Sequence, residues 1–276
     1  MASHQTRSLS FPSKAHPIVE KFDESLCRLR SSQAVSTSSS LNQTLNNLKD
    51  LYCSVHELLH LPLNQQELFQ NVNSKWVEEV LEESLRLLDI CSTSRDFLVQ
   101  SKECLQDIQS VLRRRCSSEL NITNEVVQYL NTRKSAKKSI KKSLKHIKET
   151  KQTNKENDIE SMLKDVNMIT LDVFKFVLSY IGGSKVESQK RKWCLVNKLM
   201  NHDGNKEATT TTNNEFDVVD ATLESTIYQK NKNGVERMRS QLMTLESEIQ
   251  SLDEELDFLF RHLVKTRATL LNIHSS

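Results

Sequence analysis

Residues 235–270 read VERMRSQLMTLESEIQSLDEELDFLFRHLVKTRATL and carry the most regular pattern in the chain. Apolar side chains recur there at alternating steps of three and four residues, which is the spacing of the a and d positions of a heptad repeat. This spacing predicts one long helix with a continuous apolar seam. The central positions, called the heptad seam below, are Leu242, Leu245, Ile249, Leu252, Leu256, Leu259 and Leu263.

Charged residues beside the heptad seam indicate what covers it. Glu246, Glu248, Asp253 and Glu255 flank the apolar positions. In a parallel homodimer Glu248 would face Asp253 of the second chain, and this like-charge contact disfavours such a pair. We therefore expect the seam to pack on other helices of the same chain. Pairing with a different, basic protein is the alternative.

Helices are predicted for most of the remaining chain as well. Three of the 276 residues are proline, four are glycine, and no proline follows Pro62, so few residues interrupt helix formation. Gly182 and Gly183 end one of these helices. We predict an all-α fold, an elongated bundle of long antiparallel helices with a heptad-patterned C-terminal helix. Before that last helix, apolar stripes mark about 17–31, 40–61, 74–116, 122 into the basic stretch near 141, 159–180, 193–200 and 216–227.

Composition divides the chain into four parts. Residues 1–16 form a Ser-rich arm, which we expect to be flexible, and residues 17–200 form the helical bundle. A polar, Thr-rich linker follows over 201–214, and the C-terminal helices over 215–276 are expected to pack on the bundle. The formal net charge is only +2, so the overall charge gives no reason to expect a nucleic acid partner.

Cysteine usage and hydropathy bear on the compartment. The six cysteines form no C-x-x-C pair, and no apolar leader segment stands near residue 1. We therefore expect reduced thiols and a cytoplasmic protein that is not secreted, with the nucleus or a plastid as alternatives. No apolar stretch approaches the length of about 20 residues that spans a bilayer, so we expect no transmembrane helix.

Several stretches have the character of longer family motifs. They are RSLSFPSKAHP (7–17), WVEEV (76–80), SLRLLDIC (84–91), RDFL (95–98), LRRR (112–115), RKSAKKSIKK (133–142), WCLVNKLM (193–200) and FRHLVKTRATLLNI (260–273). Together they resemble the plant helical family related to the BYPASS proteins. The resemblance covers nearly the whole chain, and the Thr-rich linker is the part that is least like a motif.

The resemblance to this family implies a function only in outline. It implies a plant-restricted protein with no established enzyme activity, associated with root and shoot development. It supplies no catalytic, metal-binding or cofactor-binding residues. We accordingly expect a protein that is not an enzyme and holds no cofactor.

One pentapeptide could nevertheless be a zinc motif. His56-Glu57-Leu58-Leu59-His60 matches H-E-x-x-H, which on a helix places two imidazoles on one face beside a general base. Pro62 ends that helix at once, no strand is predicted to bind a peptide substrate, and Glu78 or Glu79 would have to be the third ligand. We therefore interpret the two histidines as partly exposed helical residues and expect no metal.

A basic amphipathic helix is the strongest candidate for a binding surface. Ile140, Leu144 and Ile147 occupy its opposite face. The helix could bind an anionic membrane or calmodulin, or act with 190–192 as a nuclear import signal. It could equally be a solvated face whose lysines balance the acidic edge of the C-terminal helix. Nucleic acid is disfavoured, since no aromatic residues alternate with the lysines. The basic patch is Arg133, Lys134, Lys137, Lys138, Lys141, Lys142, Lys145 and Lys148.

The arm contains a possible phosphorylation motif. Arg7, Ser8, Ser10 and Pro12 fit R-S-x-S-x-P, which resembles a 14-3-3 ligand when Ser10 is phosphorylated. A chance match in a Ser-rich tail is an equal alternative, and a transit peptide is a third, because no acidic residue precedes Glu20.

These patterns together predict a non-enzymatic helical interaction or regulatory protein with protein partners. The role in root and shoot development follows from the resemblance alone. The alternative is a peripheral membrane-associated factor that binds anionic lipid or calmodulin through residues 133–151.

Overall fold

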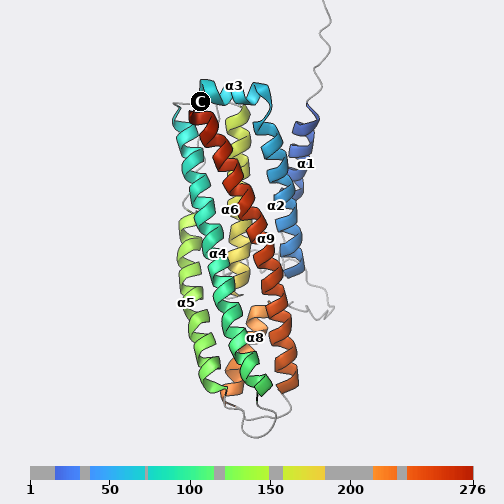
Figure 1. The fold of residues 1–276 in the computed structure, drawn as a ribbon, viewed down its shortest axis with the longest axis vertical. Helices are drawn as coiled ribbons and strands as arrows, with labels where there is room; N and C mark the ends of the chain where they lie inside the picture. The colour runs from blue at the N-terminus through green and yellow to red at the C-terminus, as the bar shows by residue number, and fades with distance from the viewer. Residues whose placement is uncertain are drawn as a thin grey trace, which may run out of the picture.

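Figure 1 shows the computed structural model, which describes residues 16–31, 38–71, 74–114, 122–148, 158–183, 214–228 and 235–275. Eight α-helices pack together in these ranges, which contain no strand, so the predicted all-α class is confirmed. Most helices follow the long axis of an elongated bundle, and α3 lies across one end. The helices are α1 (Pro17–Ser31), α2 (Ser38–Leu59), α3 (Pro62–Gln70), α4 (Lys75–Arg114), α5 (Thr123–Lys148), α6 (Asp158–Gly182), α8 (Glu215–Tyr228) and α9 (Val235–Ser275).

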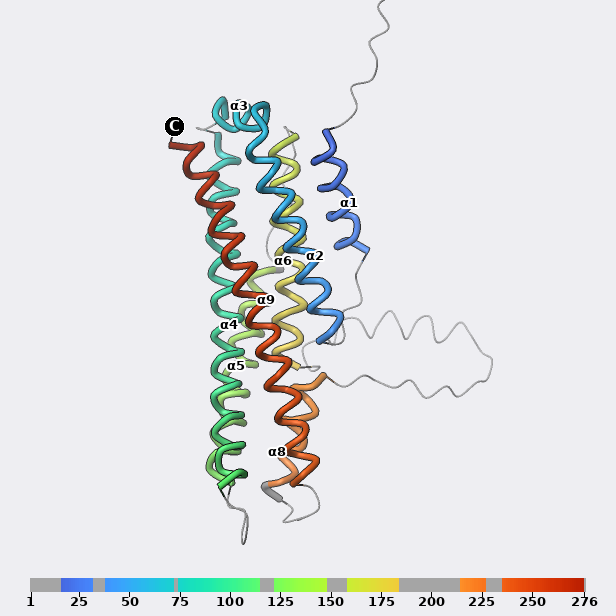
Figure 2. Tube along the Cα trace, turned by 45° about the vertical axis from the view of Figure 1, so that its right-hand side comes forward, coloured from blue at the N-terminus to red at the C-terminus, as the bar shows by residue number. Residues whose placement is uncertain are grey.

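The two longest helices, α4 and α9, run antiparallel and form the centre of the packing (Figure 1). α9 packs mainly on α4 and α2, and Figure 2 shows it crossing from the α8 end to the α3 end of the bundle. Every position of the heptad seam is at most 2% exposed. The seam is therefore covered by helices of the same chain, as the flanking acidic residues led us to expect.

Those acidic residues form contacts within the chain. Asp253 accepts from Arg95 of α4 at 2.9 Å, and Glu255 pairs with Lys49 of α2 at 2.5 Å. Glu246 accepts hydrogen bonds from two glutamines of α4. The acidic edge of α9 thus faces α4 and α2, and each of these three carboxylates has a partner.

Local sequence signals explain where the helices begin and end. Pro62 ends α2 as predicted, but it also occupies the first turn of α3, where its fixed φ suits a helix. The short α3 was not predicted, because its nine residues carry no clear apolar stripe. Gly183 follows α6 with φ +81°, and Asp217 lies so close that a Cβ at this position would collide with its carboxylate.

Three of the predicted segments cannot be compared with the structure. The arm up to residue 15, the helix expected over 193–200 and the Thr-rich linker up to residue 213 lie outside the described residues. α4 continues through Ser92–Ser94 without a break. Of the helices that the structure describes, none is long and apolar enough to cross a bilayer.

Candidate functional site

The outer face of α5 carries a row of exposed lysines. Lys134, Lys138, Lys141 and Lys145 follow one another at steps of four, three and four, which places them along one side of the helix, and Lys142 lies beside them. We call these five residues the lysine row. None of them forms an ion pair with another described residue, and the side chain of Lys148 is outside the described set. The row is therefore an exposed band of positive charge that no described carboxylate pairs with.

The apolar side of α5 is part of the core. Ile140, Leu144 and Ile147 are buried against the bundle. Calmodulin binds the apolar face of its target helix in a groove. An amphipathic helix at a membrane likewise buries its apolar face in the bilayer surface. Both modes would require α5 to leave the bundle. With α5 packed in the described bundle, the side of this helix that faces outward is the lysine row, which can attract a partner by charge.

Arg133 and Lys137 do not belong to the exposed face. Arg133 is only 2% exposed, and its Nε donates to Asp220 of α8 at 3.2 Å. Lys137 donates to the other carboxylate oxygen of Asp220 at 2.8 Å, and the hydroxyl of Tyr129 donates to the first at 2.8 Å. The guanidinium of Arg133 also lies over the ring of Phe216, 4.3 Å from its centroid. We call these five residues the Asp220 cluster, which fastens α8 to α5.

The prediction that Arg133 lies on an exposed basic face is wrong, although the sequence contains a signal for its burial. Val126, Tyr129, Ala136 and Ile140 are buried on the same side of α5, at helical steps that include position 133. An arginine within an apolar stripe needs a buried acidic partner. Asp220 interrupts the apolar stripe of α8 in the same way, but only the tertiary fold brings the two together.

Ionisation in the cluster follows from burial and pairing. Burial alone would raise the pKa of the Asp220 carboxyl, but Arg133 and Lys137 outweigh it and hold this pKa below its ordinary value. The carboxylate therefore contributes stability above its unfolded-state pKa near 4, and that contribution is lost as the pH falls through the folded-state pKa. Burial and the neighbouring Asp220 hold the pKa of Tyr129 well above its ordinary value, so Tyr129 remains a donor.

α8 is also tied to α6. Asn214 caps α8 by accepting from the backbone N–H of Phe216 at 2.8 Å and donates to the Tyr180 carbonyl at 2.5 Å. The Tyr180 hydroxyl donates to Glu215 at 2.8 Å. Asn214 and Glu215 thus connect α8 to α6, in addition to the contact of Asp220 with α5.

The H-E-x-x-H segment lies near the C-terminal end of α2. The rings of His56 and His60 meet edge to face with centroids 4.3 Å apart, and Glu57 pairs with Lys21 of α1. Glu79, a candidate for the third ligand, pairs with lysines of α4 and α6. Among the described residues, no group of three or more His, Cys, Asp or Glu side chains is placed to hold a metal.

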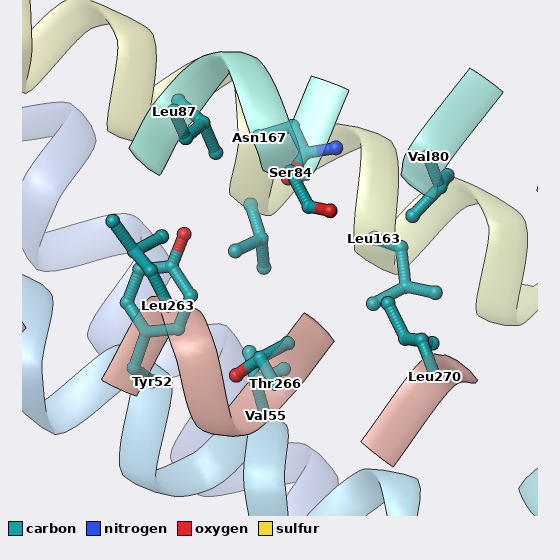
Figure 3. Close-up of a pocket in the computed structure, with 11 residues that line it drawn as sticks. Tyr52, Val55, Val80, Ser84, Leu87, Leu163, Asn167, Leu263, Thr266 and Leu270 are labelled. Atoms are coloured by element: carbon teal, nitrogen blue, oxygen red, sulfur yellow. The ribbon is translucent and has the colours of Figure 1, made fainter. Parts of the chain in front are cut away.

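A small internal cavity lies between α2, α4, α6 and α9 (Figure 3). Its volume of about 10 Å³ has room for about one water molecule. Tyr52, Ser84, Asn167 and Thr266 supply its polar lining, and Figure 3 shows them among aliphatic side chains. This cavity is too small for an organic substrate.

The cysteines that the structure describes carry free thiols, namely Cys27, Cys53, Cys91 and Cys104. Cys91 is buried against α9, and burial raises the pKa of its thiol to about 12. A thiol with this pKa is protonated at neutral pH and is a poor nucleophile.

The phosphorylation motif of Arg7, Ser8, Ser10 and Pro12 lies outside the described residues.

Residues 44–273 match the family described as Protein BPS1. The chain belongs to the BPS1 family. The matched range begins within α2 and ends within α9, so it includes the heptad seam, the lysine row and the Asp220 cluster. The family membership predicted from the motifs is thereby confirmed. No curated protein and no solved structure matches this BPS1-family chain.

Removing the carboxylate of Asp220 should destabilise the BPS1-family protein strongly. In Asp220→Ala the charge of Arg133 stays buried without its counter-ion, which we expect to cost about 3–5 kcal/mol of unfolding free energy. Urea unfolding measures the loss. Asp172→Ala is the matched control, because its half-exposed ion pair with Lys175 should contribute at most about 1 kcal/mol. Equal losses in both variants would refute a special role for the cluster.

Stability should also fall as the pH decreases from 7.5 to 5.5. Burial and then Lys265 hold the pKa of His56 and of His262 below the ordinary value near 6.5. A lowered folded-state pKa gives stability that is present above pH 6.5 and lost below it, because the unfolded chain binds the protons more tightly. The thermal midpoint of His56→Gln/His262→Gln should depend less on pH. If the thermal midpoints of the native chain and of the double variant fall equally with pH, the two histidines do not cause the loss.

Proposed function

We propose that this BPS1-family protein is a non-enzymatic interaction protein that regulates plant root and shoot development, the role that the family resemblance implies. The observation that carries the proposal is the lysine row. It is fixed on a rigid helix whose opposite side is core, and its charges have no partner among the described residues. Such a band suits recognition of an acidic surface.

The polar groups inside the bundle support a scaffold and not a reaction site. The Asp220 cluster and the cap of α8 connect helices, and Cys91 is held protonated by burial. Free thiols at the described cysteines are consistent with the cytoplasm, where we place the protein.

The partner that we propose is a protein with an acidic surface that meets the lysine row. Exposed charge pairs are screened by salt, so the contact should weaken as ionic strength rises. A second contact is proposed through the arm, where phosphorylated Ser10 would bind a 14-3-3 protein. The two contacts are independent, because the lysine row does not depend on phosphorylation.

Affinity purification from root tissue tests this function. The intact chain, Ser10→Ala and the row variant Lys138→Glu/Lys142→Glu are used as baits, and mass spectrometry identifies what each retains. We expect Ser10→Ala to lose 14-3-3 proteins only and the row variant to lose the acidic partner only. Arg237→Glu/Lys265→Glu is the control, since it changes the charge equally at exposed positions of α9. If all baits retain the same proteins, neither contact exists.

A peripheral membrane role is the second candidate, favoured by the same lysines. Each basic residue near an anionic surface contributes about 1 kcal/mol of attraction. Sedimentation with phosphatidylserine-containing vesicles measures this binding directly. If the row binds membranes, the intact chain sediments in low salt and the row variant does not. Equal sedimentation of both would exclude the row as a membrane contact.

A further inference from the structure

The outer face of α4 carries a second charged band, and this one is negative. Glu82, Asp89, Asp96 and Glu103 follow one another at steps of seven, which is close to two helical turns, and Asp107 lies one turn further. All five are exposed, and none forms an ion pair with another described residue. We call these five residues the acidic column. It contains as many negative charges as the lysine row contains positive ones.

The helices that carry the two bands, α4 for the acidic column and α5 for the lysine row, pack side by side and run antiparallel (Figure 1). Two contacts fix their alignment. Arg86 of α4 donates to the carbonyl of His146 at 2.6 Å, and Cys104 of α4 lies 3.7 Å from the hydroxyl of Thr132. Between these contacts, Asp89 is level with the segment 142–145 and Asp96 is level with Lys138. The two bands therefore occupy the same height along the bundle.

A groove lies between α4 and α5 at the level of Asp89. It has a volume of about 350 Å³ and is lined by Arg86, Asp89, Ile90 and Thr93 of α4 and by Ser143 and His146 of α5, among others. Asp89 of the acidic column lines the α4 side of the groove, and Ser143 on the α5 side follows Lys142 of the lysine row in the sequence.

We propose that this face, formed by the outer sides of α4 and α5, binds a second copy of the chain. A two-fold axis parallel to the helices and centred on the groove brings the acidic column of each copy opposite the lysine row of the other. Rotation about such an axis leaves the position of each residue along the bundle unchanged. Asp96 of one copy therefore faces Lys138 of the second copy, and Asp89 faces Lys142. Both halves of this isologous contact are complementary. A two-fold axis across the helices would instead oppose like charges.

The size of the face is adequate for a specific contact. α5 has 26 residues and is therefore about 39 Å long, and two adjacent helices present a width of about 20 Å. The product, about 800 Å² on each partner, is the area of an ordinary specific interface. The heptad seam of α9 is buried and offers no such surface.

Pairing would regulate access to the lysine row, and in this respect the inference rests on the proposed function. The dimer covers the lysine row, so an acidic partner or an anionic membrane has to compete with the second copy. The dimer itself can be tested on the purified protein alone. A monomeric protein could still bind through its exposed row, and a dimer could form even if the root baits retain nothing.

The first test is sedimentation equilibrium of the full chain over a concentration series in low and high salt. We expect a monomer–dimer equilibrium that weakens as salt rises, because the contacts are charge pairs at a solvated surface. A chain that remains monomeric at every concentration in low salt would overturn the proposal. Dimerisation that salt does not weaken would also overturn it.

Charge reversal gives the decisive test. Two double variants are measured separately, Lys138→Glu/Lys142→Glu and Asp89→Lys/Asp96→Lys. Each creates like-charge contacts in both halves of the interface, so each should dimerise at least about tenfold more weakly than the native chain. Mixed in equal amounts, they form a heterodimer in which every contact is again complementary, and association should return. The control Arg237→Glu/Lys265→Glu should dimerise as the native chain does.

The mixture also separates this proposal from misfolding and from binding of other molecules. A variant that fails to fold cannot be rescued by a second variant, and circular dichroism checks each fold independently. Full dimerisation of either variant alone, or a mixture no more associated than its components, would show that the two bands do not pair between copies.

Discussion

The heptad seam of α9 has to be covered along a helix of 41 residues, and this requirement organises the bundle. Burial of apolar surface contributes about 25 cal/mol per Å², so a seam of this length left in water would remove a large part of the stability. α4 and α2 cover it, and their contacts with the acidic edge of α9 fix its orientation. A second chain is not needed to complete this core.

Once α9 is in place, the remaining helices divide into those that fill the core and those that present charge. α6 completes the core by packing on α4, α5 and α2. α8 is held by the Asp220 cluster and by its capping residue Asn214, which donates to the Tyr180 carbonyl. α5 does both, because one side carries buried aliphatic residues and the other carries the lysine row. Its rigidity makes the row a fixed feature of the surface.

The charges of the molecule are balanced in total but not in place. The formal net charge is +2, yet the acidic column and the lysine row form two opposite bands on adjacent helices. Surface electrostatics of this kind determines partner choice and orientation more than affinity. The overall charge gave no hint of these bands, because it sums over positions that lie on different faces.

The sequence by itself determined the helical class and most of the helix boundaries, because apolar periodicity, Pro62 and Gly183 act within a few residues of themselves. The family followed from the resemblance of its longer motifs. It also determined that the seam is apolar and that its flanks are acidic. Only the tertiary structure decided that α4 and α2 cover that seam. It also decided that Arg133 is buried in an ion pair with Asp220, 87 residues away along the chain, and does not lie on the exposed basic face. It also placed the acidic column beside the lysine row. Ion pairs and neighbouring faces depend on distances through space, which a one-dimensional pattern does not contain.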